Sequence, residues 1–234
     1  GSIEILQRTI MNTNFTYLLV NIGAFIVPFL ISFHPKLQFN KEWRKTIVSI
    51  LIVGTFFIIW DIYYTKIGVW GFNPDYLLGI NIFNLPLEEV LFFICIPYAC
   101  LYTYHCFKVL IKPFNLIMSK IISGALLLVI LTIGLCYINN LYTGLTFILL
   151  FLVLRYTVFF LKPIWLNRLY LSLLILIIPF TIVNGILTGT GIETEVVWYN
   201  PNEIIGIRFL SIPIEDFFYG FLLILLNVIV FEKK

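Results

Sequence analysis

Long apolar runs recur along the chain and are separated by shorter polar segments. A helix needs about 20 residues to cross a bilayer, and the chain offers seven runs close to this length, near 15–33, 46–64, 87–107, 117–138, 141–161, 168–187 and 214–231. The first run is long enough to remain as a membrane span, so we expect no cleavable signal peptide. The pattern therefore predicts an all-α membrane protein with about seven transmembrane helices.

The start of the chain does not fit this pattern. Gly1-Ser2 is typical of a cleavage scar, and Met11 is suited to be the native start. We therefore expect residues 1–10 to be a cloning remnant and exclude them from reasoning about the fold.

Two connections, 65–86 and 188–213, are longer than the others and repeat each other. Residues 73–92 align with residues 200–219 at a constant offset of 127. Identical residues occupy Asn73 and Asn200, Pro74 and Pro201, Gly79 and Gly206, Pro86 and Pro213, and Glu88 and Glu215. Upstream of this block the offset becomes 123, and Asp61 aligns with Asn184. Identities at Gly, Pro and Glu in register indicate an internal repeat.

The repeat defines the expected organisation of the chain. A first three-helix unit spans 11–112, a linker helix spans 113–140 and a second three-helix unit spans 141–234. Equivalent helices of the two units run in the same direction, so the units are parallel. We therefore expect a 3+1+3 arrangement about a pseudo-two-fold axis along the membrane normal, which brings the starts of the third and seventh spans to equivalent positions.

Composition and charge support the membrane assignment and give an orientation. Hydrophobic residues make up 61% of the chain and charged residues only 12%, which excludes a soluble domain of this size. The net charge of +3 comes from scattered basic residues, so we expect no nucleic-acid partner.

The basic residues divide unequally between the two sides of the membrane. Eleven fall on one side, namely Lys36, Lys41, Arg44, Lys45, Lys108, Lys112, Lys120, Lys162, Arg168, Lys233 and Lys234. Three fall on the other side, Arg8, Lys66 and Arg208, and Arg155 lies within a span. By the positive-inside rule we expect an amino terminus outside and a cytoplasmic carboxy terminus in the cell (inner) membrane. Both long connections then lie on the outer side.

Each copy of the repeat carries a Pro-x-acid-acid motif at the start of a helix, with Glu88-Glu89 in the first and Glu215-Asp216 in the second. Proline suits the first helical turn, and one acid there gains about 0.3–1 kcal/mol from the helix dipole. Stabilisation of the helix start accounts for one such acid, but it accounts less well for two adjacent acids in both copies of the repeat. Neighbouring side chains point about 100° apart, so we expect one acid of each pair to face the bundle axis. We take Glu88 and Glu215 as the leading catalytic candidates and keep Glu89 and Asp216 beside them.

Asp61 is a further catalytic candidate, because acids at membrane depth are costly and usually functional. Its partner in the alignment is Asn184, so the two halves are expected to meet at one asymmetric site. Aromatic residues cluster nearby, Trp70 and Tyr199 among them, and fit either an interfacial belt or a cage for a carbocation. The side chains expected to contact a substrate are Asn184, Trp60, Tyr64, Phe92, Phe93, Phe218 and Tyr219. The cysteines form no Cys-x-x-Cys pair, and we expect no metal site.

The motif Leu85-Pro86-Leu87-Glu88-Glu89-Val90-Leu91-Phe92-Phe93 and its copy Ile212-Pro213-Ile214-Glu215-Asp216-Phe217-Phe218 resemble the small integral-membrane lycopene cyclases. These occur as two-subunit enzymes in some bacteria, as a fused domain in fungi and as a single chain in archaea. The resemblance covers nearly all of residues 15–231, with both half-sized subunits fused. The second copy departs from the pattern at Asp216 and in a shifted aromatic pair.

The resemblance implies a lycopene β-cyclase, which isomerises the linear ends of lycopene to β-ionone rings through a carbocation, giving γ-carotene and then β-carotene. A protonated carboxylic acid starts such a reaction and a second carboxylate ends it. The implied partners are lycopene, the lipid bilayer and other enzymes of the carotenoid pathway. No Gly-x-Gly-x-x-Gly motif opens a βαβ unit, so we expect no dinucleotide and no other cofactor.

Other membrane functions remain open. A proton-coupled carrier could use the same carboxylates as a relay, although its polar residues should then extend through the full depth of the bilayer. A prenyltransferase is a weaker option because the chain has no Asp-Asp-x-x-Asp motif. A retinal pigment of microbial type needs a lysine in the seventh span, and the chain has none between Arg208 and Lys233.

Overall fold

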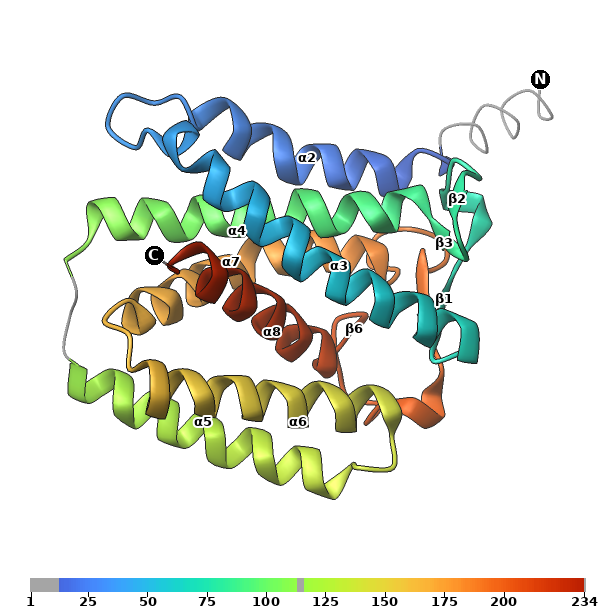
Figure 1. Cartoon of the computed structure of the whole chain (residues 1–234). Coiled ribbons are helices and arrows are strands. Elements are labelled where there is room, and N and C mark those ends of the chain that lie inside the picture. The colour runs from blue at the N-terminus through green and yellow to red at the C-terminus, as the bar shows by residue number, and fades with distance from the viewer. Residues whose placement is uncertain (1–12, 113–115, 234) are drawn as a thin grey trace.

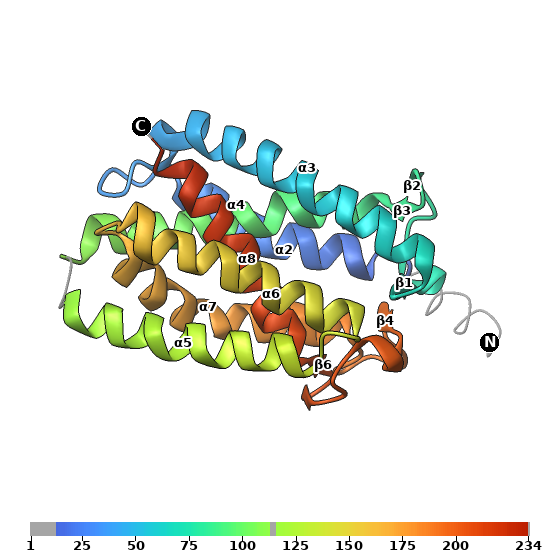
Figure 2. The ribbon, with the colours of Figure 1, turned by 60° about the horizontal axis from the view of Figure 1, so that its bottom comes forward.

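The structure of the chain is a computed structural model that describes residues 13–112 and 116–233 (Figures 1 and 2). Seven α-helices begin and end within these residues: α2 (Thr16–Ile31), α3 (Trp43–Ile67), α4 (Leu87–Leu110), α5 (Leu116–Cys136), α6 (Leu141–Tyr156), α7 (Leu166–Leu187) and α8 (Ile214–Phe231). A short 3-10 helix (Phe39–Glu42) precedes α3, and a π-helical turn (Thr157–Leu161) extends α6. The predicted helical character is confirmed. The expected remnant at 1–10 and the start at Met11 lie outside the described residues.

Six of these helices, α3 to α8, are long and apolar enough to cross a membrane, which makes the chain an integral membrane protein. The expected first span is shorter than predicted, because α2 has 16 residues and a length of about 24 Å, below the roughly 30 Å of a hydrocarbon core. Pro35 follows closely and disfavours helical backbone at the residue before it, so the helix cannot be lengthened to a full span at this end. The orientation and the choice of the cell membrane stay predictions.

Helix α8 lies at the centre of the bundle, against α3, α4 and α6 (Figure 2). Of the most apolar stretch of α8, 56% is buried inside the protein. The corresponding share for α5, which packs on α6 at the periphery, is 28%. α2 packs along α4 on the other side of the molecule (Figure 1). The outward faces carry exposed apolar residues such as Leu30, Leu51 and Leu128, which suits contact with lipid chains.

The two long connections fold over one end of the bundle, which we call the loop end, and form short strands that the helical pattern did not predict. β1 (Trp70–Phe72) pairs antiparallel with β4 (Val197–Tyr199) and so joins the two connections. The hairpins β2 (Asn81–Ile82) with β3 (Leu85–Pro86) and β5 (Arg208–Phe209) with β6 (Ile212–Pro213) lead directly into α4 and α8. These hairpins place the acidic motifs at the loop end.

The two copies of the sequence repeat adopt the same local backbone. The side chains of Asn73 and Asn200 each accept the backbone N–H of the residue two positions on, as the caps of η2 (Pro74–Tyr76) and η4 (Pro201–Glu203). The hairpin turns carry left-handed residues at equivalent positions, Phe83 with φ 57° and Leu210 with φ 56°. The sequence repeat is therefore also a repeat of local structure at the loop end.

Candidate functional site

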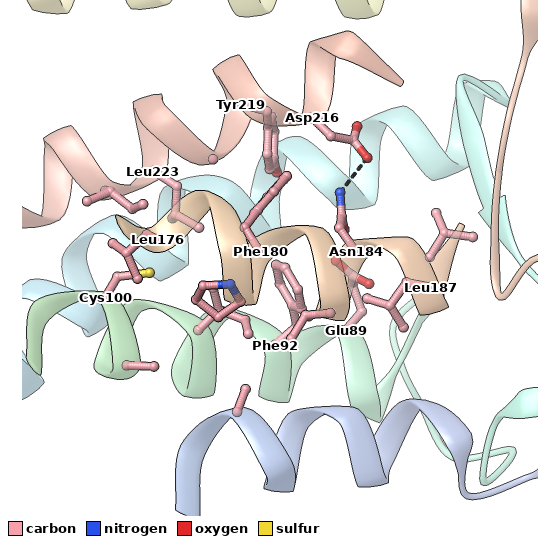
Figure 3. Close-up of a pocket in the computed structure, with 18 of the residues that line it drawn as sticks. Glu89, Phe92, Cys100, Leu176, Phe180, Asn184, Leu187, Asp216, Tyr219 and Leu223 are labelled. Atoms are coloured by element: carbon pink, nitrogen blue, oxygen red, sulfur yellow. Dashed lines mark hydrogen bonds between the residues drawn. The ribbon is translucent and has the colours of Figure 1, made fainter. Parts of the chain in front are cut away.

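A cavity of about 360 Å³ lies between α2, α4, α7 and α8 and is covered at the loop end by β1 and β4 (Figure 3). Glu89 and Asp216 line it near the loop end, whereas Cys100, Leu176 and Leu223 line the far end. Most of the wall between them is aliphatic or aromatic. The volume falls within the range of small-molecule sites, which are mostly apolar with a few placed polar groups.

The second acid of each Pro-x-acid-acid motif is the one that reaches this cavity. The hydroxyl of Tyr17 donates a hydrogen bond to the Glu89 carboxylate. Asp216 accepts hydrogen bonds from the Tyr142 hydroxyl at 2.6 Å, the Tyr199 hydroxyl at 2.9 Å and the Asn184 amide at 2.7 Å. Both carboxyl groups are buried and lie close enough to each other to interact electrostatically.

The first acid of each motif faces the connection that precedes its helix. The backbone N–H of Leu78 donates to Glu88 at 2.6 Å, and the backbone N–H of Ile205 donates to Glu215 at 2.7 Å. The hydroxyl of Thr143 also donates to Glu215 at 2.6 Å. Glu88 and Glu215 are buried but do not line the cavity. These two acids tie the long connections to the starts of α4 and α8.

The aligned residues Asp61 and Asn184 stand beside the two cavity acids. Asn184 donates its amide to Asp216 inside the cavity (Figure 3). Asp61 lies behind Glu89, outside the cavity lining, and the two carboxyl groups interact electrostatically. Asp61 also accepts the indole N–H of Trp70. One half of the site therefore pairs two carboxyl groups, and the other half pairs an amide with a carboxyl group.

The predicted aromatic residues divide between the cavity wall and the layer behind it. Phe92 and Tyr219 line the cavity. Trp60 packs behind Tyr219 with 5.4 Å between ring centroids. Tyr64, Phe93 and Phe218 also lie outside the lining and pack against neighbouring aromatic rings.

Several cavity residues were not singled out as site residues from the sequence, among them Tyr17 and Tyr142. These two tyrosines each donate to the second acid of a different repeat. They are separated by 125 positions, and an asparagine, Asn14 or Asn139, precedes each by three positions. Extending the repeat alignment into the first helix of each unit would have found them. Trp70 and Tyr199 also line the cavity, although the sequence placed them only in the general aromatic cluster.

Tyr199 lies in β4, at the cover of the cavity. Burial, with the nearby Asp216 carboxylate, raises the pKa of Tyr199 well above its ordinary value. A raised pKa keeps the phenol protonated at neutral pH, so Tyr199 remains a hydrogen-bond donor to Asp216.

Comparison with known proteins gives matches in one family. The chain matches the lycopene cyclase family over residues 14–107 and 139–233. It is similar to the bifunctional lycopene cyclase/phytoene synthase of Aspergillus niger, with 35% identity over 71 residues that make up 30% of this chain and 12% of the relative. The proteins of the same name from Arthroderma gypseum and Colletotrichum graminicola are 33% and 39% identical, over 42% and 29% of this chain and 17% and 11% of the relatives.

The chain therefore spans less than a fifth of the length of these relatives in each match. No solved structure matches the chain. The family match leaves out residues 108–138, which contain α5, and includes both Pro-x-acid-acid motifs and every acid at the cavity. Since that match extends over most of the sequence, the chain belongs to the lycopene cyclase family.

Proposed function

We propose that the chain is a carotenoid cyclase that isomerises the linear ends of lycopene to β-ionone rings, giving γ-carotene and then β-carotene. The observation that carries this proposal is the pair of buried acids, Glu89 and Asp216, at one end of an otherwise apolar cavity. An apolar polyene end fits the wall, and an acid-catalysed isomerisation needs one group to give a proton and one to take it. No oxidant, reductant or cofactor enters the balance of this reaction.

Glu89 is the proposed acid. Two carboxylates as close as those of Glu89 and Asp61 cannot both carry a charge in a low-dielectric interior, so the pair holds a proton. Glu89 faces the cavity and passes this proton to the terminal double bond of the polyene, which leaves a tertiary carbocation. The Tyr17 hydroxyl, which donates to Glu89, stabilises the carboxylate that remains.

Asp216 is the proposed base. Its three donors, Tyr142, Tyr199 and Asn184, favour the ionised form. As a carboxylate it stabilises the carbocation while the neighbouring double bond attacks and closes the ring. It then removes a proton from the new ring, and a weak base is sufficient because a carbocation gives up a proton readily. The proton gained by Asp216 balances the one lost by Glu89, so the product is an isomer of the substrate.

The aromatic side chains at the acidic end are proposed to shelter the cation. The ring of Tyr219 lines the cavity and lies 6.2 Å from the ring of Trp70 and 5.9 Å from that of Tyr142, measured between centroids. The faces of such rings attract a positive charge within about 6 Å. They also exclude water, which would otherwise trap the cation as an alcohol.

We also propose that the two three-helix units are parallel and related by a pseudo-two-fold axis. The register of β1 with β4 supports this, because Gly71 pairs with Trp198, and the two residues are separated by 127 positions, the offset of the adjoining repeat block. The backbone hydrogen bonds from Asn73 to Val196 and from Asn200 to Val69 are also equivalent, and both measure 2.8 Å. Such an axis brings Glu89 and Asp216 to opposite sides of one cavity.

The proposal is tested by expressing the chain in cells that accumulate lycopene and separating the carotenoids by chromatography. Cyclase activity converts red lycopene to orange-yellow γ-carotene and β-carotene. Unchanged lycopene, with the protein shown to be folded in the membrane, would contradict the proposal.

The alternative function, a proton-coupled carrier, is not favoured. The acids that line the cavity gather at the loop end, and the far end is lined by apolar groups such as Leu176 and Leu223.

A further inference from the structure

The exposed residues of the cavity lining lie on only two helices of the described chain. These residues are Gly23 and Val27 on α2 and Pro179 on α7, and the side chain of Val27 is 56% exposed. The lining residues of α4 and α8 are buried or partly buried. Within residues 13–112 and 116–233 the cavity therefore reaches the surface between α2 and α7.

The two helices touch at the loop end and leave this opening further along. Tyr17 and Val20 of α2 pack in one apolar cluster with Val183 and Leu187 of α7, which closes the cavity near the acids. Beyond this contact α2 presents Gly23 and then Ala24 to the cavity. A Cβ added at Gly23 would meet no atom within 4 Å, so space is open at this rim.

The surface around the opening is suited to contact with lipid chains. On α2 it is flanked by Ile22 and Ile26, which are 47% and 41% exposed, and on α7 by Ile178 and Ile182, which are 65% and 60% exposed. Residues 16–31 contain no charged side chain, and Arg168 is the one charged residue of 166–187. Gly23 lies about 10 Å along α2 from Thr16, so the opening lies well within the apolar length of the helix.

The size of the cavity limits what enters through this opening. Its volume of about 360 Å³ lies near the lower end of the range for small-molecule sites. A site of this size suits one cyclising end of a polyene, and the rest of the polyene then lies outside. A lipid-facing opening lets this remainder lie among acyl chains without contact with water.

We propose that the gap between α2 and α7, bordered by Gly23, Val27 and Pro179, is a lateral portal by which one end of the polyene enters the cavity from the lipid phase. The proposal rests on the proposed cyclase function and adds the path of the substrate. Among the described residues the cavity has one exposed rim, and the acids lie deeper inside. Each end of the polyene must therefore enter the cavity separately to be cyclised. The monocyclic product must leave the cavity and return by its other end.

Replacement of Gly23 by larger residues tests the portal. In lycopene-accumulating cells, Gly23→Trp places a ring across the opening, and conversion per folded protein should fall about tenfold or more because the polyene end cannot reach the acids. Ile22→Trp is the matched control: it adds the same side chain one position away, at a lipid-facing residue outside the lining, and should retain at least about half of the conversion.

Two further measurements keep the test decisive. Val27→Trp enlarges a side chain already exposed at the rim, so it should reduce conversion even if Gly23→Trp lowers the folded amount. A time course of the unsubstituted chain should show free γ-carotene rising before β-carotene. If Gly23→Trp and Val27→Trp both convert lycopene at the control rate, or if β-carotene appears without free γ-carotene, the portal is wrong. If the unsubstituted chain converts no lycopene, the proposed function fails first.

Discussion

Asn184 donates a 2.7 Å hydrogen bond to Asp216 inside the cavity, at the position where the other half of the chain places Asp61 beside Glu89. The two halves therefore treat equivalent acids differently. An amide donor stabilises a carboxylate, whereas a second carboxyl group forces a shared proton. This one difference assigns the proposed roles of acid and base, and it can be tested by exchanging the residue types.

Removal of the cavity acids should abolish cyclisation, and removal of the loop-facing acids should not. Glu89→Gln and Asp216→Asn keep the shape but lose the proton transfer, so conversion should fall about 100-fold or more. Glu88→Gln and Glu215→Gln keep an oxygen that accepts the N–H of Leu78 or Ile205, and conversion should stay within about threefold. Chromatography of the carotenoids, normalised to folded protein, checks both pairs. Loss of activity in Glu88→Gln alone would place the acid at the first position of the motif.

Asp61→Asn should inactivate the chain through its effect on Glu89. The new amide would donate to Glu89 as Asn184 donates to Asp216, and Glu89 would remain a carboxylate with no proton to give. We expect conversion to fall at least about tenfold, with unchanged folded protein. Asn184→Asp should also lower conversion, but through Asp216, because the new carboxyl group makes Asp216 share a proton and weakens it as a base. If Asp61→Asn retains full activity, the proton is not held by the Asp61–Glu89 pair.

Tyr17→Phe should reduce activity more than Tyr142→Phe. Each change removes one hydroxyl donor from a cavity acid, and a hydrogen bond to a charged group contributes about 1.5–3 kcal/mol. Asp216 keeps Tyr199 and Asn184 as donors after the loss of Tyr142. Glu89, by contrast, accepts a hydrogen bond from one hydroxyl group of the described residues, that of Tyr17. Initial rates of cyclisation for the two variants give the comparison, and equal rates would argue against separate roles for the two acids.

Gly71→Ala should destabilise the cover of the cavity. A Cβ at Gly71 would lie 2.3 Å from the ring of Trp198, its partner in the β1–β4 ladder. We expect a loss of about 1–3 kcal/mol in the free energy of unfolding, seen as a lower midpoint in thermal unfolding of the detergent-solubilised protein. Gly71→Ala with Trp198→Ala should recover most of this loss because the clash is gone. Gly23→Ala, where no atom lies within 4 Å of the added Cβ, serves as the control.

Much of the candidate site could be found from the sequence because it is duplicated. The repeat located both acidic motifs and the aligned pair of Asp61 and Asn184, and all of these residues lie at or next to the cavity. The sequence also predicted that one acid of each pair would face the bundle, and it ranked Glu88 and Glu215 first. A 100° step on a helix surface separates the two positions, and only the packing of α4 and α8 decides which of them points inward.

Hydrophobic run length, register and residue type are local properties of the chain, so they were enough to predict the helical membrane architecture, the repeat and the chemistry of the acids. The arrangement of the site depends on the folded chain. Folding turned Glu88 and Glu215 toward the long connections and Glu89 and Asp216 into the cavity. It paired β1 with β4 across more than a hundred residues, and it left an opening between α2 and α7. Each of these depends on contacts between segments far apart in sequence, which no local pattern specifies.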